Sequence, residues 1–257
     1  MIKLSAVIIT FNEERNIERC LQSLVDVADE IVVVDSNSTD NTKTICAKFN
    51  VKFVTHLFEG HIEQKNYAIT QASYPHILSL DADECLDDLL KQEIISVKQN
   101  FTADGYSMNR LTNYCGQWIR HSGWYPDIKL RLWDSSKGRW GGINPHDQFM
   151  FTDSRSTEIH LKGNILHYSY YTVEEHLERS ERYAAIAANE LLMKGKKINL
   201  IMIYLKTISK FIRNYFIHAG FLDGKNGFII CKIAAHETWL KYKLLYSLTI
   251  KKPGTKS

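Results

Sequence analysis

The sequence lacks several features that define particular classes of protein. Its five cysteines are an odd number and include no CxxC pair, so we expect neither a disulfide framework nor a zinc site. No apolar run approaches the roughly 18 residues that a membrane-spanning helix needs. The first residues lead directly into a strand-like segment, without the apolar region and cleavage site of a signal peptide. These absences predict a cytoplasmic protein with reduced thiols.

Two nucleotide-binding fingerprints are also missing. The sequence contains neither a GxGxxG motif nor a Walker loop, which argues against a dinucleotide-binding enzyme and against a P-loop NTPase. Internal repeats and low-complexity segments are absent as well. A chain of 257 residues, 44% hydrophobic and 24% charged, has the composition of an ordinary globular protein.

Charge is distributed unevenly along the chain. Residues 1–192 hold 19 Lys and Arg against 27 Asp and Glu, a net charge of −8. Residues 193–257 hold the other 13 basic residues against only two acidic ones, a net charge of +11. An acidic body and a basic tail indicate two different tasks, so we predict a domain over 1–192 and a separate C-terminal region over 193–257.

Strand-like and helix-like segments alternate in the first hundred residues. Apolar, β-branched runs predict strands over 4–9, 31–34, 51–54 and 77–80. Helical spacing predicts a helix after Asn12, its expected N-cap, and further helices from Ser38 to Phe49 and over 61–73. This alternation predicts an α/β fold of parallel βαβ units in a nucleotide-binding half, 1–100.

The second half of the predicted domain, 101–192, reads differently. It is rich in aromatic residues and glycine and is less periodic up to Tyr171, which is typical of loops and short strands around a binding cleft or of an irregular core. From Thr172 onward the pattern is helical. We assign acceptor binding to this half.

Polar residues follow three of the predicted strands. They are Thr10–Glu13, the stretch from Asp35 through Asn37 to Asp40, and Asp81–Glu84. Ligands of an open parallel sheet bind beyond the carboxyl ends of its strands, so these residues are expected at one edge. Carboxylates gathered there would repel one another, and a bound cation or a set of donors is therefore expected as well.

The Asp81-Ala82-Asp83 spacing suits a metal ion. Alternate residues of an extended chain point to the same side, so both carboxylates could face one Mg²⁺ or Mn²⁺. Such an ion neutralises charge that develops on a diphosphate leaving group. The alternative is that Asp83 or Glu84 caps the following helix.

Three further residues have both a functional and an ordinary interpretation. Asp35 either accepts from a nucleobase or ribose, or stabilises its own turn. Lys65 either reaches a phosphate or is a solvated surface lysine. Asp147, beside His146 after a Gly-Gly turn, is either the general base that an inverting glycosyl transfer requires or an ordinary loop residue.

Longer stretches carry a family resemblance. Ser5–Glu14, Glu30–Ser36 and Leu80–Glu84 resemble the motifs of glycosyltransferase family 2 in sequence, order and spacing. The lipopolysaccharide-core glucosyltransferases of bacteria are a narrower branch, and similar segments occur here at 113–116, 121–127, 129–132, 144–147 and 167–169. The resemblance covers nearly the whole chain.

The resemblance implies a GT-A fold, with a Rossmann-like and mostly parallel sheet flanked by helices. It also implies an inverting displacement from a nucleotide-diphosphate sugar, with UDP the expected nucleotide. The residues expected to bind the donor nucleotide are Thr10, Asn12, Glu13, Asp35, Asn37, Lys65 and Asp81.

The remaining roles follow from the same resemblance. Asp83 binds the metal, with Asp81 as a second ligand and His167 as either a third ligand or a core histidine. Asp147 is the general base, at a position where branch members often carry Glu. The residues expected to bind the acceptor are Trp124, Tyr125, Arg131 and His146. The QxxRW motif of processive members is absent, which predicts addition of a single sugar.

The basic tail contains an amphipathic helical pattern over 199–221. Its apolar members are Ile201, Leu205, Ile208, Ile212 and Tyr215, and its basic members are Lys206, Lys210 and Arg213. Such a helix either lies in an anionic membrane interface or packs on the rest of the protein or on a partner subunit. The charge of the tail favours the membrane, and no motif indicates a nucleic acid.

Together these features predict a metal-assisted, inverting hexosyltransferase, with glucose as the leading sugar. Its acceptor is the lipopolysaccharide core or another lipid-linked glycan, and its place is the inner face of the bacterial inner membrane, as a peripheral protein. Two alternatives remain: a nucleotidyltransferase, and a non-catalytic protein that binds a sugar nucleotide or glycan.

Overall fold

The computed structural model describes residues 1–143 and 146–251, apart from the side chains of Ile143, His146 and Lys251. The chain forms two compact units. The first unit comprises residues 1–111 and 127–168, and the second comprises 112–126 and the chain from 169 onward. The second unit therefore begins before the basic tail, and it also includes a segment from the aromatic middle of the sequence.

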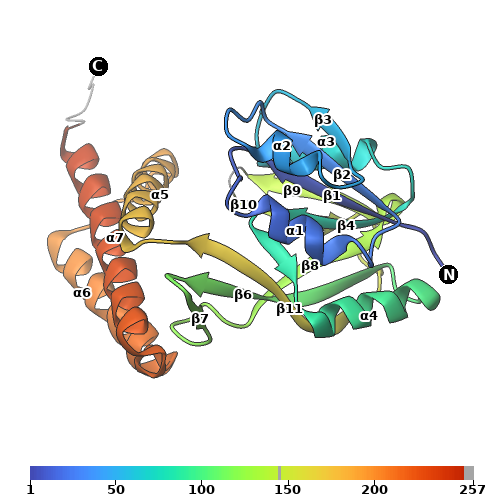
Figure 1. Cartoon of the computed structure of the whole chain (residues 1–257). Coiled ribbons are helices and arrows are strands. Elements are labelled where there is room, and N and C mark those ends of the chain that lie inside the picture. Colours follow the sequence, from blue (N-terminus) through green and yellow to red (C-terminus); the bar gives the residue numbers. More distant parts are fainter. Residues whose placement is uncertain (144–145, 252–257) are drawn as a thin grey trace, which may run out of the picture. The chain divides into compact units, whose positions relative to one another are not determined.

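The core of the first unit is a parallel sheet of four strands. Its order is β3-β2-β1-β4 (Figure 1), and the strands are β1 (Leu4–Thr10), β2 (Glu30–Asp35), β3 (Lys52–Thr55) and β4 (His76–Asp81). Ile9 of β1 is paired with both Val34 and Asp81, so the carboxyl ends of these strands lie side by side. The strand order reverses between β1 and β4, which is the point where ligands bind in open α/β sheets.

Antiparallel strands extend this sheet beyond β4. The order continues β8-β6-β11-β5, with β7 on β6, and the strands are β5 (Glu84–Leu86), β6 (Gly105–Tyr114), β7 (Gln117–Ile119), β8 (Asp127–Asp134) and β11 (Glu158–Tyr170). The aromatic middle region thus contains strands of up to 13 residues as well as short ones. The predicted α/β class is confirmed, with its parallel part confined to the first hundred residues.

Helices cover one face of the parallel strands. Alternate residues of β1, such as Leu4 and Ile8, point into a core formed with α1 (Ile17–Leu24), α2 (Thr42–Cys46) and α4 (Asp88–Gln99). Buried residues in α1 recur every three or four positions, as expected of a helix with one apolar face.

The other face is covered by α3 (His61–Thr70) and by a hairpin of β9 (Gly138–Ile143) and β10 (His146–Phe151). Trp133 and Trp140 lie here, with ring centroids 5.9 Å apart, and Phe149 packs against both. These two tryptophans therefore belong to the core. The hairpin carries Asp147, and α3 carries Lys65.

Two helix starts differ from the sequence-based expectations. Asn16, not Asn12, is the N-cap of α1, because Asn12 has φ +54° and belongs to the loop after β1. Asp87 caps α4 by accepting from the Leu90 amide at 2.8 Å, so neither Asp83 nor Glu84 has that role.

The second unit is largely helical. It contains α5 (Val173–Met193), α6 (Leu200–Ile212) and α7 (Gly224–Lys251), and α5 and α6 both pack on α7 (Figure 1). A capping box of Thr172 and Glu175 begins α5, which confirms the predicted start of the helical region. No helix in the described ranges is both long and apolar enough to cross a membrane.

Candidate active site

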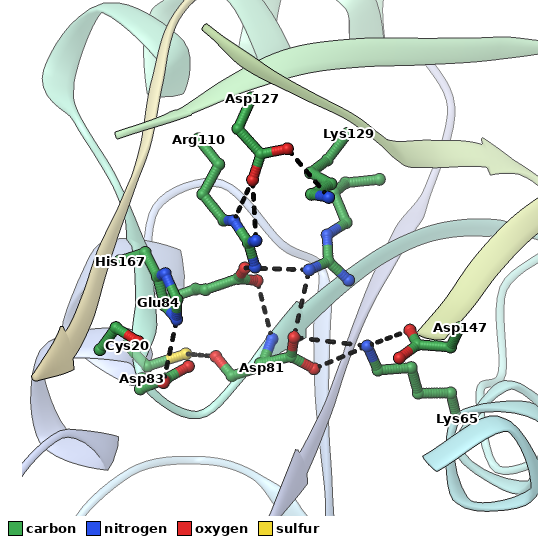
Figure 2. A network of polar contacts seen from close by, with 12 residues as sticks. Cys20, Lys65, Asp81, Asp83, Glu84, Arg110, Asp127, Lys129, Asp147 and His167 are labelled. Carbon is green, nitrogen blue, oxygen red and sulfur yellow. Dashed lines mark hydrogen bonds and ion pairs between the residues drawn. The ribbon is translucent and has the colours of Figure 1, made fainter. Parts of the chain in front are cut away.

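Asp81 ends β4 at the switch point of the sheet, and Asp83 lies two positions later in the chain. Residues 82 and 83 form a turn, so the chain does not continue in the extended form that the spacing alone suggested. Figure 2 shows the result: Asp81 points toward Lys65, whereas Asp83 points toward His167. The two carboxylates therefore have different partners.

Lys65 joins two of the predicted site residues. Its Nζ atom lies 2.9 Å from Oδ1 of Asp81 and 2.8 Å from Oδ2 of Asp147 (Figure 2). The lysine side chain is only 4% exposed and lies over the Trp140 ring, with Nζ 4.5 Å from the ring centroid. Lys65 is thus a buried bridge between the first carboxylate of the DxD motif and the candidate base, not a solvated surface lysine.

A second set of cations compensates Glu84. The Glu84 side chain is fully buried and accepts from Nη2 of Arg131 at 2.9 Å and from Nη1 of Arg110 at 3.3 Å. The same Nη2 atom of Arg131 lies 3.1 Å from Asp81. Arg110 also contacts Asp127, with Nη2 2.7 Å from Oδ2. One network of alternating charges therefore extends from Asp127 to Asp147.

Pairing keeps Asp81 and Arg131 ionised. Burial alone raises the pKa of Asp81, but the positive charges of Lys65 and Arg131 outweigh it and hold that pKa well below its usual range. Burial lowers the pKa of Arg131, and the charges of Glu84 and Asp81 reverse this and raise it. Asp81 and Arg131 thus form a fixed pair of opposite charges at physiological pH.

Asp83 and His167 form the candidate metal centre. Nε2 of His167 lies 3.2 Å from Oδ2 of Asp83, and both side chains are largely buried. Within the described ranges, no three His, Cys, Asp or Glu side chains are grouped so as to hold an ion. Asp83 and His167 offer one oxygen and one nitrogen donor, which fits an ion that takes its other ligands from water and a diphosphate. Asp81 fits that role less well, because two cations already occupy its carboxylate.

Several buried donors have no acceptor among the described residues. They are Nε and Nη1 of Arg131 in the network, Nε1 of Trp140, whose ring contacts Arg131 and Lys65, and Oγ1 of Thr10 at the carboxyl end of β1. Buried polar groups are normally hydrogen-bonded, so a group of such donors indicates a place for a ligand with acceptor oxygens. Thr10 was predicted to bind the nucleotide, and Arg131 and Trp140 were not.

The other predicted nucleotide residues connect the loops after β1 and β2. Oδ1 of Asn12 accepts from the Thr39 amide at 2.8 Å, and the Asp35 carboxylate accepts from the Ser38 amide at 2.9 Å. Asn37 has φ +62°, a conformation that Asn tolerates better than most residues. Asp35 therefore stabilises its own turn, and contact of these residues with a nucleoside stays a prediction.

The predicted acceptor residues do not form one group. Trp124 and Tyr125 lie in the second unit, where Trp124 packs against Tyr114 with ring centroids 5.7 Å apart. Arg131 is buried in the charge network of the first unit and is only 3% exposed. The side chain of His146 lies outside the described residues. Acceptor binding by these residues stays a prediction.

Two members of the network were not singled out from the sequence. Arg110 contacts Glu84 and Asp127 contacts Arg110, and they lie 26 and 43 positions beyond Glu84 in the chain. Strand pairing between β6 and β8 makes Arg110 and Asp127 neighbours. Their positions in the sequence give no sign of this. The position of Glu84 directly after the DxD motif did place it among the polar residues expected at the edge of the sheet.

The family profile described as Glycosyl transferase family 2 matches residues 5–159, more than half of the chain. The chain belongs to glycosyl transferase family 2. The matched range contains every member of the charge network from Lys65 to Asp147. The resemblance read from the sequence motifs is confirmed, and the protein is a glycosyltransferase.

Relatives of this glycosyltransferase are similar over nearly its whole length. An uncharacterized glycosyltransferase of Rickettsia bellii is 32% identical over 99% of this chain and 90% of its own. The lipopolysaccharide core biosynthesis glycosyltransferase LpsC of Rhizobium meliloti is 26% identical over 95% of this chain and 92% of its own. Among solved structures, S. aureus TarS 1–349 aligns with a TM-score of 0.42 at 13% identity, over 99% of this chain and 93% of that one.

Proposed function

We propose that this glycosyltransferase moves one hexose, with glucose as the leading sugar, from a UDP-linked donor to a lipid-linked glycan acceptor such as the lipopolysaccharide core. The observation that carries the proposal is the Lys65 bridge, because it holds the candidate base Asp147 beside the DxD motif. The similarity to LpsC, which is named for lipopolysaccharide core biosynthesis, supports the acceptor class.

Asp147 has the geometry of a positioned base. Among the described residues only its Oδ2 atom has a partner, Lys65, and its side chain is 16% exposed. In the proposed inverting step the acceptor oxygen attacks the anomeric carbon and the bond to the diphosphate breaks. The acceptor proton passes to Asp147, and UDP leaves with the electron pair.

Asp83 and His167 are the residues proposed to hold Mg²⁺ or Mn²⁺. When bound, the ion supplies positive charge for the departing diphosphate. The unpartnered donors of Thr10, Arg131 and Trp140 are proposed to bind donor oxygens at the same edge of the sheet. Arg131 thereby takes the phosphate-binding role that sequence analysis gave to Lys65.

The protein is proposed to work at the cytoplasmic face of a bacterial inner membrane, attached through the basic region 193–257. The family match favours glycosyl transfer over nucleotidyl transfer. Retention of the compensated carboxylates Asp81, Glu84 and Asp147 supports catalysis over binding alone.

A thermal-shift titration with UDP, GDP, CDP and dTDP, with and without Mn²⁺, tests the donor site. At a concentration about 100 times Kd, a bound nucleotide stabilises the folded state by about 2.7 kcal/mol. We expect UDP to give the largest shift and Mn²⁺ to increase it. Asp83→Ala should lose the Mn²⁺ effect, and Asp26→Ala at an exposed position should keep it. The absence of a response to any of the four nucleotides would contradict the proposal.

A further inference from the structure

The helix α6 has an apolar stripe that the protein does not cover. The four predicted stripe residues that lie on α6 are largely exposed: Ile201 70%, Leu205 54%, Ile208 56% and Ile212 46%. The fifth, Tyr215, lies beyond the end of α6 and packs against Phe211 and Phe228. At helical spacing the four lie on one side of α6, whereas Ile203, the buried residue of this helix, lies on the opposite side. The stripe is therefore not used to pack the second unit.

A groove of about 460 Å³ lies beside this stripe, between α6 and α7. Its lining residues are Leu205, Lys206, Ser209, Lys210, Arg213, Thr238, Lys241 and Tyr242. Leu205 belongs to both features, so the groove and the apolar stripe are continuous. Four of the eight lining side chains carry positive charge, and three others carry hydroxyl groups, of which that of Thr238 already donates to the Ala234 carbonyl.

The cations of the groove converge without compensation. Nζ of Lys206 and Nζ of Lys241 lie 5.3 and 4.9 Å from the centroid of the same Tyr242 ring. In the described part of the chain, no carboxylate comes within 4 Å of Lys206, Lys210, Arg213 or Lys241. Like charges held this close repel one another, and an anion in the groove would relieve the repulsion.

The pKa of Lys210 is lowered by burial and by this crowding of positive charges. Burial lowers its pKa and the charge of Arg213 lowers it further; Glu237 opposes this, and Lys241 adds a smaller lowering effect. Glu237 accepts from Oγ of Ser180 at 3.4 Å, and its charge also interacts with those of Lys241 and Lys210. The neighbouring carboxylate of Glu237 thus hydrogen-bonds to α5 and forms no ion pair with the four cations in the described part of the chain.

We propose that this groove binds the phosphate groups of anionic phospholipids while the α6 stripe enters the apolar part of the same membrane. A phosphate has the charge and the acceptor oxygens that the groove lacks. The continuity of groove and stripe matches an amphiphile whose polar and apolar ends are joined. This inference rests on the proposed membrane attachment and assigns it to named residues; it does not depend on glycosyl transfer.

Flotation of the full-length protein with phosphatidylcholine vesicles, with and without phosphatidylglycerol, tests the site. We expect binding only when phosphatidylglycerol is present. Basic residues at a membrane surface contribute roughly fivefold each, so Lys206→Gln/Lys241→Gln should weaken binding about 25-fold. The matched control is Lys225→Gln/Lys232→Gln, which removes the same charge from exposed positions of α7 outside the groove. The control variant should lose far less of its binding to the vesicles.

If both double variants lost vesicle binding equally, net charge alone would attract the protein to the membrane. That result would overturn the proposal that the groove binds phosphate groups. Binding to pure phosphatidylcholine at the same strength would do so as well. Ile201→Ser/Ile208→Ser should weaken binding in high salt, where insertion dominates, and an unchanged affinity there would overturn insertion of the stripe. UDP-induced thermal shifts in all variants separate failure of this site from failure of the donor site.

Discussion

The two units differ in whether their clustered charges form ion pairs. In the first unit, each buried charge of the network has a partner of opposite sign within about 3 Å, as Glu84 has in Arg131 and Asp147 has in Lys65. In the second unit, the four cations between α6 and α7 have no such partner among the described residues. Paired charges fix side chains in position, whereas unpaired charges need a partner from outside the chain.

The largest expected effect is on catalysis in the paired region. A general base contributes roughly 10²–10⁴-fold, so Asp147→Asn should reduce transfer about a thousandfold. UDP binding should persist, since Lys65 retains Asp81. Release of UDP in the presence of a lipid-linked acceptor measures the loss. Asp153→Asn, which is paired with Arg155 in an exposed loop, is the matched control and should stay active. Activity of Asp147→Asn above about a tenth of wild type would remove Asp147 from this role.

The next effect is on the stability of the first unit. Glu84→Ala leaves the buried guanidinium groups of Arg131 and Arg110 without their carboxylate. Breaking a buried pair costs about 3–5 kcal/mol. At roughly 2–4 °C per kcal/mol, the melting temperature should fall by about 10 °C.

Glu158→Ala removes an exposed glutamate of the same unit and should change the melting temperature by no more than about a degree or two. Equal shifts in the two variants would mean that the charge network contributes nothing special to stability.

As the pH falls, the second unit should lose stability before the first. Burial, with a smaller contribution from Arg179, lowers the pKa of His176 to about 4. Its pKa is about 6.5 when unfolded, so the unfolded state takes up a proton first and the second unit loses stability as pH falls from about 6.5 to 4, by up to about 3 kcal/mol.

In the first unit burial raises the pKa of Asp29, but Lys98 and other donors outweigh it and bring it to about 2. That stability is present above about pH 4 and is lost only as pH falls toward 2. Hydrogen exchange against pH should therefore show α5 losing protection before β1. His176→Gln should remove the difference. Simultaneous loss in the wild-type protein would contradict this assignment.

The smallest effect tests the unpaired cations directly. Lys210→Gln removes a charge that its surroundings disfavour, so unfolding free energy should be unchanged or higher by a few tenths of a kcal/mol. Lys65→Gln, the same substitution in the paired network, should destabilise by several kcal/mol, because two partly buried carboxylates lose their cation. Denaturant titration measures both. A destabilised Lys210→Gln would mean that this lysine has a partner within the protein.

Much of the first unit could be predicted because its signals are local. β-branched runs mark β1, β2 and β4, and the polar residues after them identify the edge where the network lies. The DxD spacing predicted that Asp81 and Asp83 face one ion, but a two-residue turn, which the spacing does not show, gives the two carboxylates different partners. The local pattern and the family resemblance both indicated Asp147 as a candidate base, but neither showed its contact with Lys65, which spans 82 positions.

Long-range pairing explains what could not be predicted. Arg110 and Arg131 reach Glu84 only because β6, β8 and β4 are joined in the sheet. The periodicity of α6 revealed its apolar stripe but not whether another element covers it. Nor could the sequence show that basic residues of α6 and α7 converge on the Tyr242 ring.

The unpartnered nitrogens of Arg131 have a consequence for the energetics of substrate binding. A guanidinium that is 3% exposed has already given up its hydration when the chain folds. An oxyanion that arrives at Nε and Nη1 therefore does not have to strip water from the arginine, and the donors need no reorientation. The free-energy cost of dehydration falls on the stability of the empty protein, and the proposed binding of donor oxygens at Arg131 recovers it.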